Sequence, residues 1–202
     1  VFVAGTHDIT TLQAALRPYA AETRRWVVLP LHAGLSAEEQ DRVFDAAPEG
    51  VRKAILSTNI AETSVTIDGV RFVADSGRAK EMVHDAASGA GSLQEGWISR
   101  ASADQRKGRA GRTGPGKCFR MYAAPQYEAF RPFSLPEIQR VRLESVVLQI
   151  RALAGDGMDP RAFGFIDPPP DDAMEGAVIT LCQVGALRWG SEALTPLGAA
   201  LS

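Results

Sequence analysis

The sequence predicts an α/β fold: a parallel sheet with helices on both faces, followed by a smaller, mainly helical module. Up to about residue 130, short apolar runs alternate with helical segments on short loops, which is typical of a parallel sheet covered by helices. After that point prolines interrupt the chain and helical periodicity dominates. The composition, 45% hydrophobic and 23% charged, excludes wholesale disorder.

The elements of the first part follow one another in a regular order. The apolar runs predict strands at 1–4, 26–30, 53–57, 70–75 and 118–122. The spacing of apolar residues predicts a helix over 8–21, and 102–112 can form another. Ser36 and Glu39 form a capping box, with Ser36 as the N-cap of another helix. Segments 80–85 and 93–99 flank a glycine-rich stretch and predict a hairpin.

The second part predicts a winged-helix module. An amphipathic helix over 142–154 and a proline-rich connector at 167–170 lead to a second helix over 171–184. Gly185 suits the end of that helix, and 186–195 predicts a small hairpin. We therefore divide the chain into domains at 1–131 and 132–202, and expect it to be a piece of a longer protein.

The charge is unevenly distributed. The net charge of −2 excludes a globally basic nucleic-acid coat, yet residues 100–120 hold seven basic residues and one acid. Such a segment favours one anion-binding site, and the alternative is a solvated helix face. No apolar run approaches the ~18 residues of a membrane span. Two cysteines are too few for a disulfide framework or a zinc site.

The strongest chemical motif is Gln105-Arg-Lys-Gly-Arg109-Ala-Gly-Arg112. Gln105, Arg109 and Arg112 fall at i, i+4 and i+7, which makes one polar stripe on a helix. Paired guanidinium groups beside an amide suit a transferring γ-phosphate. The alternative is an arginine-rich surface helix, but such helices seldom contain two glycines, each costing ~1 kcal/mol relative to alanine.

A second motif, 57–69, places hydroxyl, amide and carboxyl groups directly after a predicted strand. Such groups suit phosphate or ribose oxygens, and Asp68 could accept a ribose hydroxyl or orient water. The alternative is an ordinary helix N-terminus with several possible caps.

A third motif, 111–118, nearly matches a P-loop but is rejected. Cys118 replaces the hydroxyl residue that would bind magnesium, and a helix precedes the loop where a P-loop requires a strand.

At these residues the chain resembles the DEAH-box RNA helicases. QRKGRAGR and STNIAETSVTIDG resemble motifs VI and V of that family, at its spacing, and VFVAGTHDI resembles motif IV. The resemblance covers essentially the whole chain and implies the second RecA-like domain plus most of a winged helix. TRRWVVLPLHAGLS, DSGRAKEMVHD and LQEGWIS most resemble the branch that acts in nonsense-mediated mRNA decay.

The resemblance also implies roles for individual residues. Arg109 and Arg112 would be arginine fingers, with Gln105 near the γ-phosphate or the attacking water. The nucleotide-binding residues would be Ser64, Thr66, Asp68 and Arg78. The RNA-binding residues would be Gly5, Thr6, Thr58 and Asn59. Arg78 departs from the family, which often has an aromatic residue there to stack on the base, although arginine can also stack on a base.

The implied cofactor is ATP with Mg2+, whose metal ligands lie outside this chain. The P-loop lysine and the DEAH sequence are missing from these residues, and the resemblance places both in the first RecA-like domain. The fragment alone is therefore expected to be inactive. The implied partners are RNA, the first RecA-like domain of the same protein and an activating protein. We expect no membrane association and an intracellular location, in the cytoplasm or nucleus.

Two other classes of function compete with an active helicase. One is a catalytically silent relative that serves as an RNA-binding or protein-docking scaffold, which a mutated motif VI would favour. Here Gln105, Arg109 and Arg112 are all present. The other, a free-standing nucleotide-binding regulator, needs a complete phosphate cradle, which the near match at 111–118 does not supply.

Overall fold

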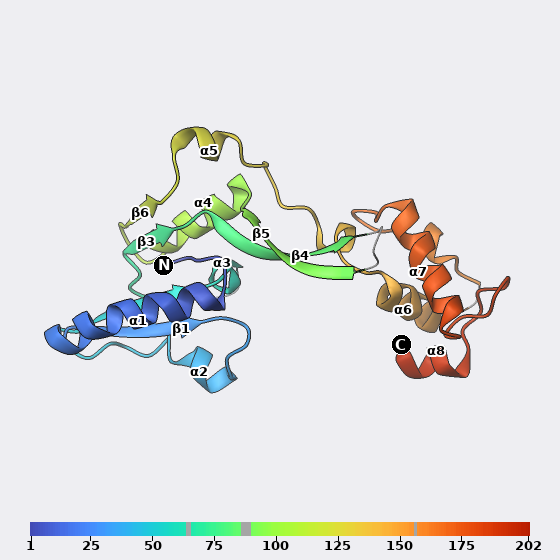
Figure 1. The fold of residues 1–202 in the computed structure, drawn as a ribbon, viewed down its shortest axis with the longest axis horizontal. Coiled ribbons are helices and arrows are strands. Elements are labelled where there is room, and N and C mark those ends of the chain that lie inside the picture. The colour runs from blue at the N-terminus through green and yellow to red at the C-terminus, as the bar shows by residue number, and fades with distance from the viewer. Residues whose placement is uncertain (64–65, 86–89, 156) are drawn as a thin grey trace. The chain divides into compact units, whose positions relative to one another are not determined.

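The computed structural model describes residues 1–63, 66–85, 90–155 and 157–202 (Figure 1). The chain forms two compact units. The first is Val1–Glu81 with Gln94–Ser134, and the second is Met82–Leu93 with Leu135–Ser202. Each unit has its own hydrophobic core.

The first unit is built on a parallel sheet. Strand β1 (Trp26–Leu31) pairs with β2 (Arg52–Ser57), and β3 (Phe72–Asp75) pairs with β6 (Lys117–Arg120), both in parallel. Phe2 forms parallel bridges with Ser57 of β2 and with Asp75 of β3. The N-terminal segment therefore lies between β2 and β3, and the predicted parallel sheet is confirmed.

Helices cover both faces of this sheet, because successive apolar residues of its strands point to opposite faces and both faces must be buried. Ile9 of α1 (Thr6–Thr23) packs with Val3 and Leu56 in one cluster. Ala110 of α4 (Arg100–Ala110) packs with Phe2 and its neighbours in another. The shorter helices are α2 (Ala37–Asp41), α3 (Ile60–Thr63) and α5 (Ala124–Glu128). The predicted capping box is formed, because Glu39 N–H donates to Ser36 Oγ at 3.3 Å.

Two predicted elements of this region need comment. The hairpin consists of β4 (Arg78–Asp85) and β5 (Ala90–Trp97). Of its predicted tip, 86–91, residues 86–89 lie outside the described residues and the last two belong to β5. The helix expected over 102–112 ends at Ala110, so Arg112 lies just beyond it. The helical spacing that predicted one stripe therefore holds for Gln105 and Arg109, whereas Arg112 lies in the turn after the helix.

The second unit is mainly helical. Its helices are α6 (Glu144–Ala154), α7 (Asp171–Gln183) and α8 (Pro196–Leu201), with short 3-10 turns η1 (Glu137–Gln139) and η2 (Pro160–Ala162). The apolar face of α6 packs on that of α7, as predicted from their periodicity. Gly185 follows α7 with φ +75°, which suits a residue without a side chain. The predicted hairpin is a single antiparallel bridge between Leu187 and Leu194.

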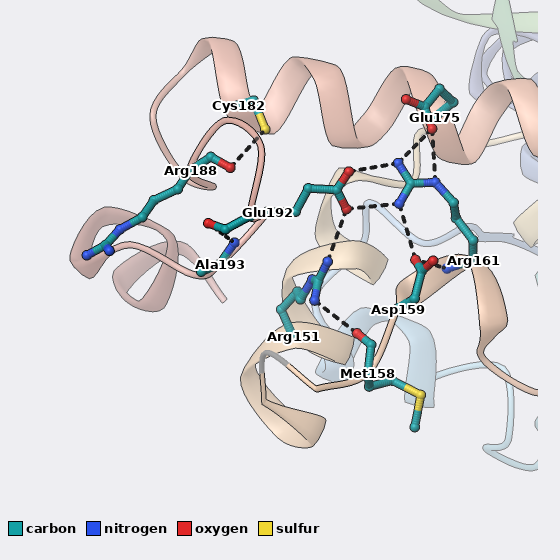
Figure 2. A network of polar contacts seen from close by, with 10 residues as sticks. Arg151, Met158, Asp159, Arg161, Glu175, Cys182, Arg188, Glu192 and Ala193 are labelled. Carbon is teal, nitrogen blue, oxygen red and sulfur yellow. Dashed lines mark hydrogen bonds and ion pairs between the residues drawn. The ribbon is translucent and has the colours of Figure 1, made fainter.

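Two arginines of the second unit, Arg151 and Arg161, form a network of ion pairs and hydrogen bonds (Figure 2). The Arg161 guanidinium forms ion pairs with Asp159 at 3.2 Å, Glu175 at 2.6 Å and Glu192 at 2.9 Å. Arg151 of α6 reaches Glu192 at 3.0 Å and donates to the Met158 carbonyl at 3.0 Å. These contacts connect η2, α6 and α7 to the turn at Glu192.

No helix in the described parts of the chain combines the length and the apolar character needed to cross a membrane.

Candidate functional site

The predicted ligand-binding residues gather where neighbouring parallel strands end. Gly5 follows the N-terminal segment, Thr58 follows β2, and Arg78 follows β3 after a two-residue turn. Phe2 bridges both Ser57 and Asp75, so these carboxyl ends meet at one edge of the sheet. Ligand sites of parallel α/β sheets lie at this edge.

The turn at Gly5 and Thr6 opens helix α1. The Gly5 N–H donates to Asp8 Oδ2 at 3.0 Å, and Thr6 is exposed. A Cβ atom on Gly5 would lie 3.2 Å from both Cε and Nζ of Lys80. The glycine therefore allows the Lys80 amine to lie against the turn, which sequence reasoning did not anticipate.

The loop after β2 is held by its own backbone. Thr58 N–H donates to the Leu31 carbonyl at 3.2 Å, and Glu62 N–H donates to the Asn59 carbonyl at 2.9 Å. Thr58 is half-buried and Asn59 is exposed. The backbone is thus fixed while the Asn59 side chain stays accessible to a ligand.

Motif VI places its polar residues on and just beyond α4. Gln105 and Arg112 are exposed, and Arg109 is half-buried. Burial lowers the pKa of the Arg109 guanidinium, the positive charge of Arg112 lowers it further, and Glu62 opposes both effects. Both guanidinium groups thus contribute positive charge to the C-terminal end of α4 and the turn that follows it.

The end of motif V lies beside the end of motif VI. Gly69 N–H donates to Thr113 Oγ1 at 3.3 Å, so the turn after Thr66 and Asp68 adjoins the residue that follows Arg112. Gly69 has a φ of +77°, which favours glycine. Thr66 and Asp68 are both exposed. Ser64, which is also a predicted nucleotide contact of motif V, lies outside the described residues.

Arg78 stacks on an aromatic ring. Its guanidinium carbon lies 3.5 Å from the centre of the Trp97 ring. Trp97 in turn packs against Phe130, with ring centres 5.4 Å apart. Gly77 permits this packing, since it has a φ of +72° and a Cβ there would lie 2.6 Å from Cδ1 of Tyr122. The Arg78 guanidinium is therefore supported by Trp97, a residue that was not among the predicted site residues.

Sequence reasoning also missed a buried ionic network centred on Arg106. Its Nε donates to Glu62 Oε1 at 2.7 Å, and its Nη1 donates to Asp75 Oδ1 at 2.8 Å. A signal for its burial was present, since Ala103 and Ala110 lie three residues before and four after Arg106. Small apolar residues at that spacing define the buried side of a helix.

Asp75 is a shared acceptor at the end of β3. Besides Arg106, it accepts from the Gly77 N–H at 2.9 Å and from the Tyr122 hydroxyl at 3.0 Å. Burial raises the pKa of the Tyr122 hydroxyl, and the negative Asp75 raises it further. Tyr122 therefore remains a protonated donor at neutral pH.

Among the described residues, no group of three His, Cys, Asp or Glu side chains is placed to hold a metal ion. The cationic groups described above suit the anionic part of a nucleotide.

Comparisons with known proteins agree with this geometry. The family model of the helicase conserved C-terminal domain matches residues 1–114. Proteins named probable ATP-dependent RNA helicase DHX34, from Mus musculus and Homo sapiens, are each 58% identical over 202 residues. The DExH-box ATP-dependent RNA helicase DExH3 of Arabidopsis thaliana is 40% identical over 204 residues.

A solved structure shares the fold. The crystal structure of the Escherichia coli DEAH/RHA helicase HrpB superposes with a TM-score of 0.84 at 34% identity, covering 98% of this chain and 24% of that chain. The chain spans 17% of the length of the DHX34 and DExH3 relatives.

Proposed function

This chain belongs to the family of DEAH-box ATP-dependent RNA helicases, and we propose from that premise that it forms one wall of an ATP site and part of an RNA channel. The match over residues 1–114 and the identity to the DHX34 proteins confirm the predicted resemblance. The names of the relatives do not mention mRNA decay, so the assignment to that branch stays a prediction.

One observation carries the ATP site: the end of motif V lies beside the end of motif VI, because Gly69 N–H donates to Thr113 Oγ1, the residue directly after Arg112. We infer that both guanidinium groups bind the γ-phosphate and stabilise the charge that develops as it is transferred. Gln105 orients the attacking water, and Thr66, Asp68 and Ser64 contact the nucleotide on its ribose side.

The nucleotide is ATP with Mg2+, and when bound the metal neutralises charge on the phosphate oxygens. The metal ligands and the P-loop lysine belong to the first RecA-like domain, which is a partner of this one. Arg78 supplies a flat cation on which the base stacks, with Trp97 behind it. A flat cation attracts the face of any base, so this contact discriminates little between nucleotides.

RNA binds along the edge formed by Gly5, Thr6, Thr58 and Asn59. The Thr58 hydroxyl, the Asn59 amide and the start of α1 at Thr6 are donors for phosphates of the RNA backbone. The Lys80 amine beside Gly5 adds a positive charge. Phosphate contacts of this kind fix position and carry no sequence information.

We propose that residues 132–202 form a winged helix that follows this RecA-like domain. Two packed helices, the antiparallel bridge of Leu187 with Leu194 and the final helix α8 support the assignment. An activating protein remains a further proposed partner.

Replacing Arg112 with alanine in the full-length protein tests the proposal. We expect ATPase activity to fall ~10³–10⁵-fold, the usual contribution of an arginine finger, while RNA binding stays intact. Lys107→Ala is the matched control, because Lys107 is an exposed cation on α4 outside the stripe. An Arg112→Ala rate within about threefold of the unmodified protein would overturn the assignment.

The silent-scaffold alternative shares the fold but requires a disabled site. The stripe in this chain keeps all three polar residues, with the arginines accessible or half-buried. The same ATPase measurement on the unmodified full-length protein separates the two, because a scaffold would show no RNA-stimulated hydrolysis.

A further inference from the structure

Arg106 lies inside motif VI but cannot meet a ligand directly. Its side chain is 0% exposed, whereas Gln105 and Lys107 on either side are exposed. The guanidinium lies against the Phe2 ring, 4.9 Å from the ring centre. Its Nη2 has no hydrogen-bond partner among the described residues. Burying an arginine with an unused donor costs free energy, so core packing alone does not explain an arginine at this position.

The partners of Arg106 come from three separate segments. Glu62 belongs to α3, with Oε1 at 2.7 Å from Nε. Asp75 ends β3, with Oδ1 at 2.8 Å from Nη1. The Arg78 carbonyl, in the turn after β3, accepts from the same Nη1 at 3.1 Å. One side chain on α4 thus fixes the loop after β2 and the turn after β3.

Each of these segments carries a proposed ligand contact. The Glu62 backbone holds the carbonyl of the RNA-binding Asn59. Asp75 holds the Gly77 N–H directly before the base-binding Arg78. Arg109 follows Arg106 by one helical turn, so its phosphate-binding guanidinium sits on the same rigid helix. Arg106 therefore lies at the meeting point of the RNA, base and phosphate contacts.

The Arg106 network is better suited to holding its three partner segments in position than to stabilising the folded state. Burial raises the pKa of the Glu62 carboxyl even though Arg106 opposes this shift. Apolar residues of similar volume often replace a buried ion pair without loss of stability. They cannot, however, hold three segments at fixed distances through a planar, directional fork.

We propose that Arg106 is a positioning residue that couples RNA binding at the loop after β2 to the phosphate-binding arginines of α4. A shift of that loop on RNA binding moves Glu62, and the ion pair passes the movement to α4. The inference rests on the proposed function, because it needs both an RNA contact at Asn59 and phosphate contacts at Arg109 and Arg112.

The test is the RNA stimulation of ATPase activity in the full-length protein. Arg106→Lys keeps the charge but loses the fork that reaches three acceptors. We expect the ratio of kcat with RNA to kcat without RNA to fall about 10-fold, within the usual range of coupling between sites. The KM for ATP and the affinity for single-stranded RNA should stay within about threefold, because no ligand contact is removed.

A second variant keeps the test decisive if Arg106→Lys does not fold. Glu62→Gln keeps the shape and the acceptor oxygen and removes only the charge. It should lower the same ratio, and combining it with Arg106→Lys should add little, since both act on one interaction. Arg120→Lys is the matched control, because the half-buried Arg120 also forms an ion pair with a residue of α4, the exposed Asp104. That control should leave the ratio unchanged.

Two results would overturn the proposal. The first is unchanged RNA stimulation in folded Arg106→Lys or in Glu62→Gln. The second is a parallel loss of ATP affinity, RNA affinity and melting temperature, which indicates a structural role only. Failure of the proposed function is distinguishable, because then Arg109→Ala and Arg112→Ala would retain full activity whatever Arg106 does.

Discussion

Two arginines three positions apart in motif VI have opposite environments, and their neighbours explain why. Arg106 shares the buried side of α4 with Ala103 and Ala110. Arg109 is only half-buried. The motif therefore holds one arginine that is a buried internal support and one that is accessible to the proposed ligand, and the number of arginines alone does not separate the two.

Trp97 offers a test of how the base is held. Trp97→Ala removes the ring beneath Arg78 and frees its guanidinium, so we expect ATP to bind about 2–30-fold more weakly, the equivalent of ~0.5–2 kcal/mol. Trp97→Phe, which keeps an aromatic face, should lose much less. Titration of the full-length protein with a non-hydrolysable ATP analogue measures both. Equal affinity of Trp97→Ala and the unmodified protein would contradict the stacking role.

Thr58 and Asn59 should hold RNA without reading its sequence. Changing both to alanine removes donors to phosphate, so the affinity should fall by a similar factor for every single-stranded RNA tested. Fluorescence anisotropy with homopolymers of the four bases is a suitable measurement. A loss confined to one of them would indicate base recognition at this loop.

At the scale of elements, the pattern of apolar residues predicted the sheet strands, α1, α6 and α7, because burial on one or both faces leaves a regular pattern. The ends of elements were less predictable. Motif VI continues past α4 because Gly111 follows Ala110 and has little helix propensity. The pairings of Arg106 and Arg161 could not be predicted, since all their ion-pair partners except Asp159, two residues before Arg161, lie 14 to 44 residues away along the chain.

The Arg161 network should make the second unit sensitive to acid. Hydrogen bonds from the Arg161 side chain lower the pKa of Glu192 below its ordinary value of 4.5. The backbone N–H of the same arginine lowers the pKa of Asp159 below 3.8. A lowered folded-state pKa gives stability that is present above the ordinary value and is lost as the pH falls through the folded value. The contribution should therefore begin to decline below about pH 4.5 and be lost at still lower pH.

Glu192→Gln tests this directly. At pH 7 we expect a loss of about 1 kcal/mol, small because the ion pairs are partly exposed. That corresponds to a melting temperature lower by about 2–4 °C. The difference from the unmodified protein should shrink as the pH is lowered from 5 to 3. Glu22→Gln, at an exposed position of α1, is the control. A difference that does not change with pH would show that the Glu192 charge contributes nothing.

At the scale of the whole molecule, the chain is one part of a larger machine. It spans 17% of its DHX34 relatives, and the P-loop lysine and DEAH sequence are not among its residues. We propose that its strand ends and arginine stripe form a single wall of a nucleotide site. The resemblance of motifs implies that arrangement, whereas the contacts of Arg106 and Trp97 became visible only when distant segments were placed side by side.

The 202-residue chain by itself should therefore bind ATP poorly and hydrolyse none. Without the opposite wall, Arg109 and Arg112 meet phosphate in water, where salt screens the attraction and no metal supports it. We expect a Kd for ATP no tighter than ~1 mM, which is ~4 kcal/mol of binding. Calorimetric titration of the purified chain with ATP and Mg2+ measures this, and an Arg109→Ala, Arg112→Ala double variant reports any residual contribution of the stripe. Micromolar binding by the unmodified chain would mean that a complete nucleotide site lies within these residues, which contradicts the two-domain arrangement proposed for ATP.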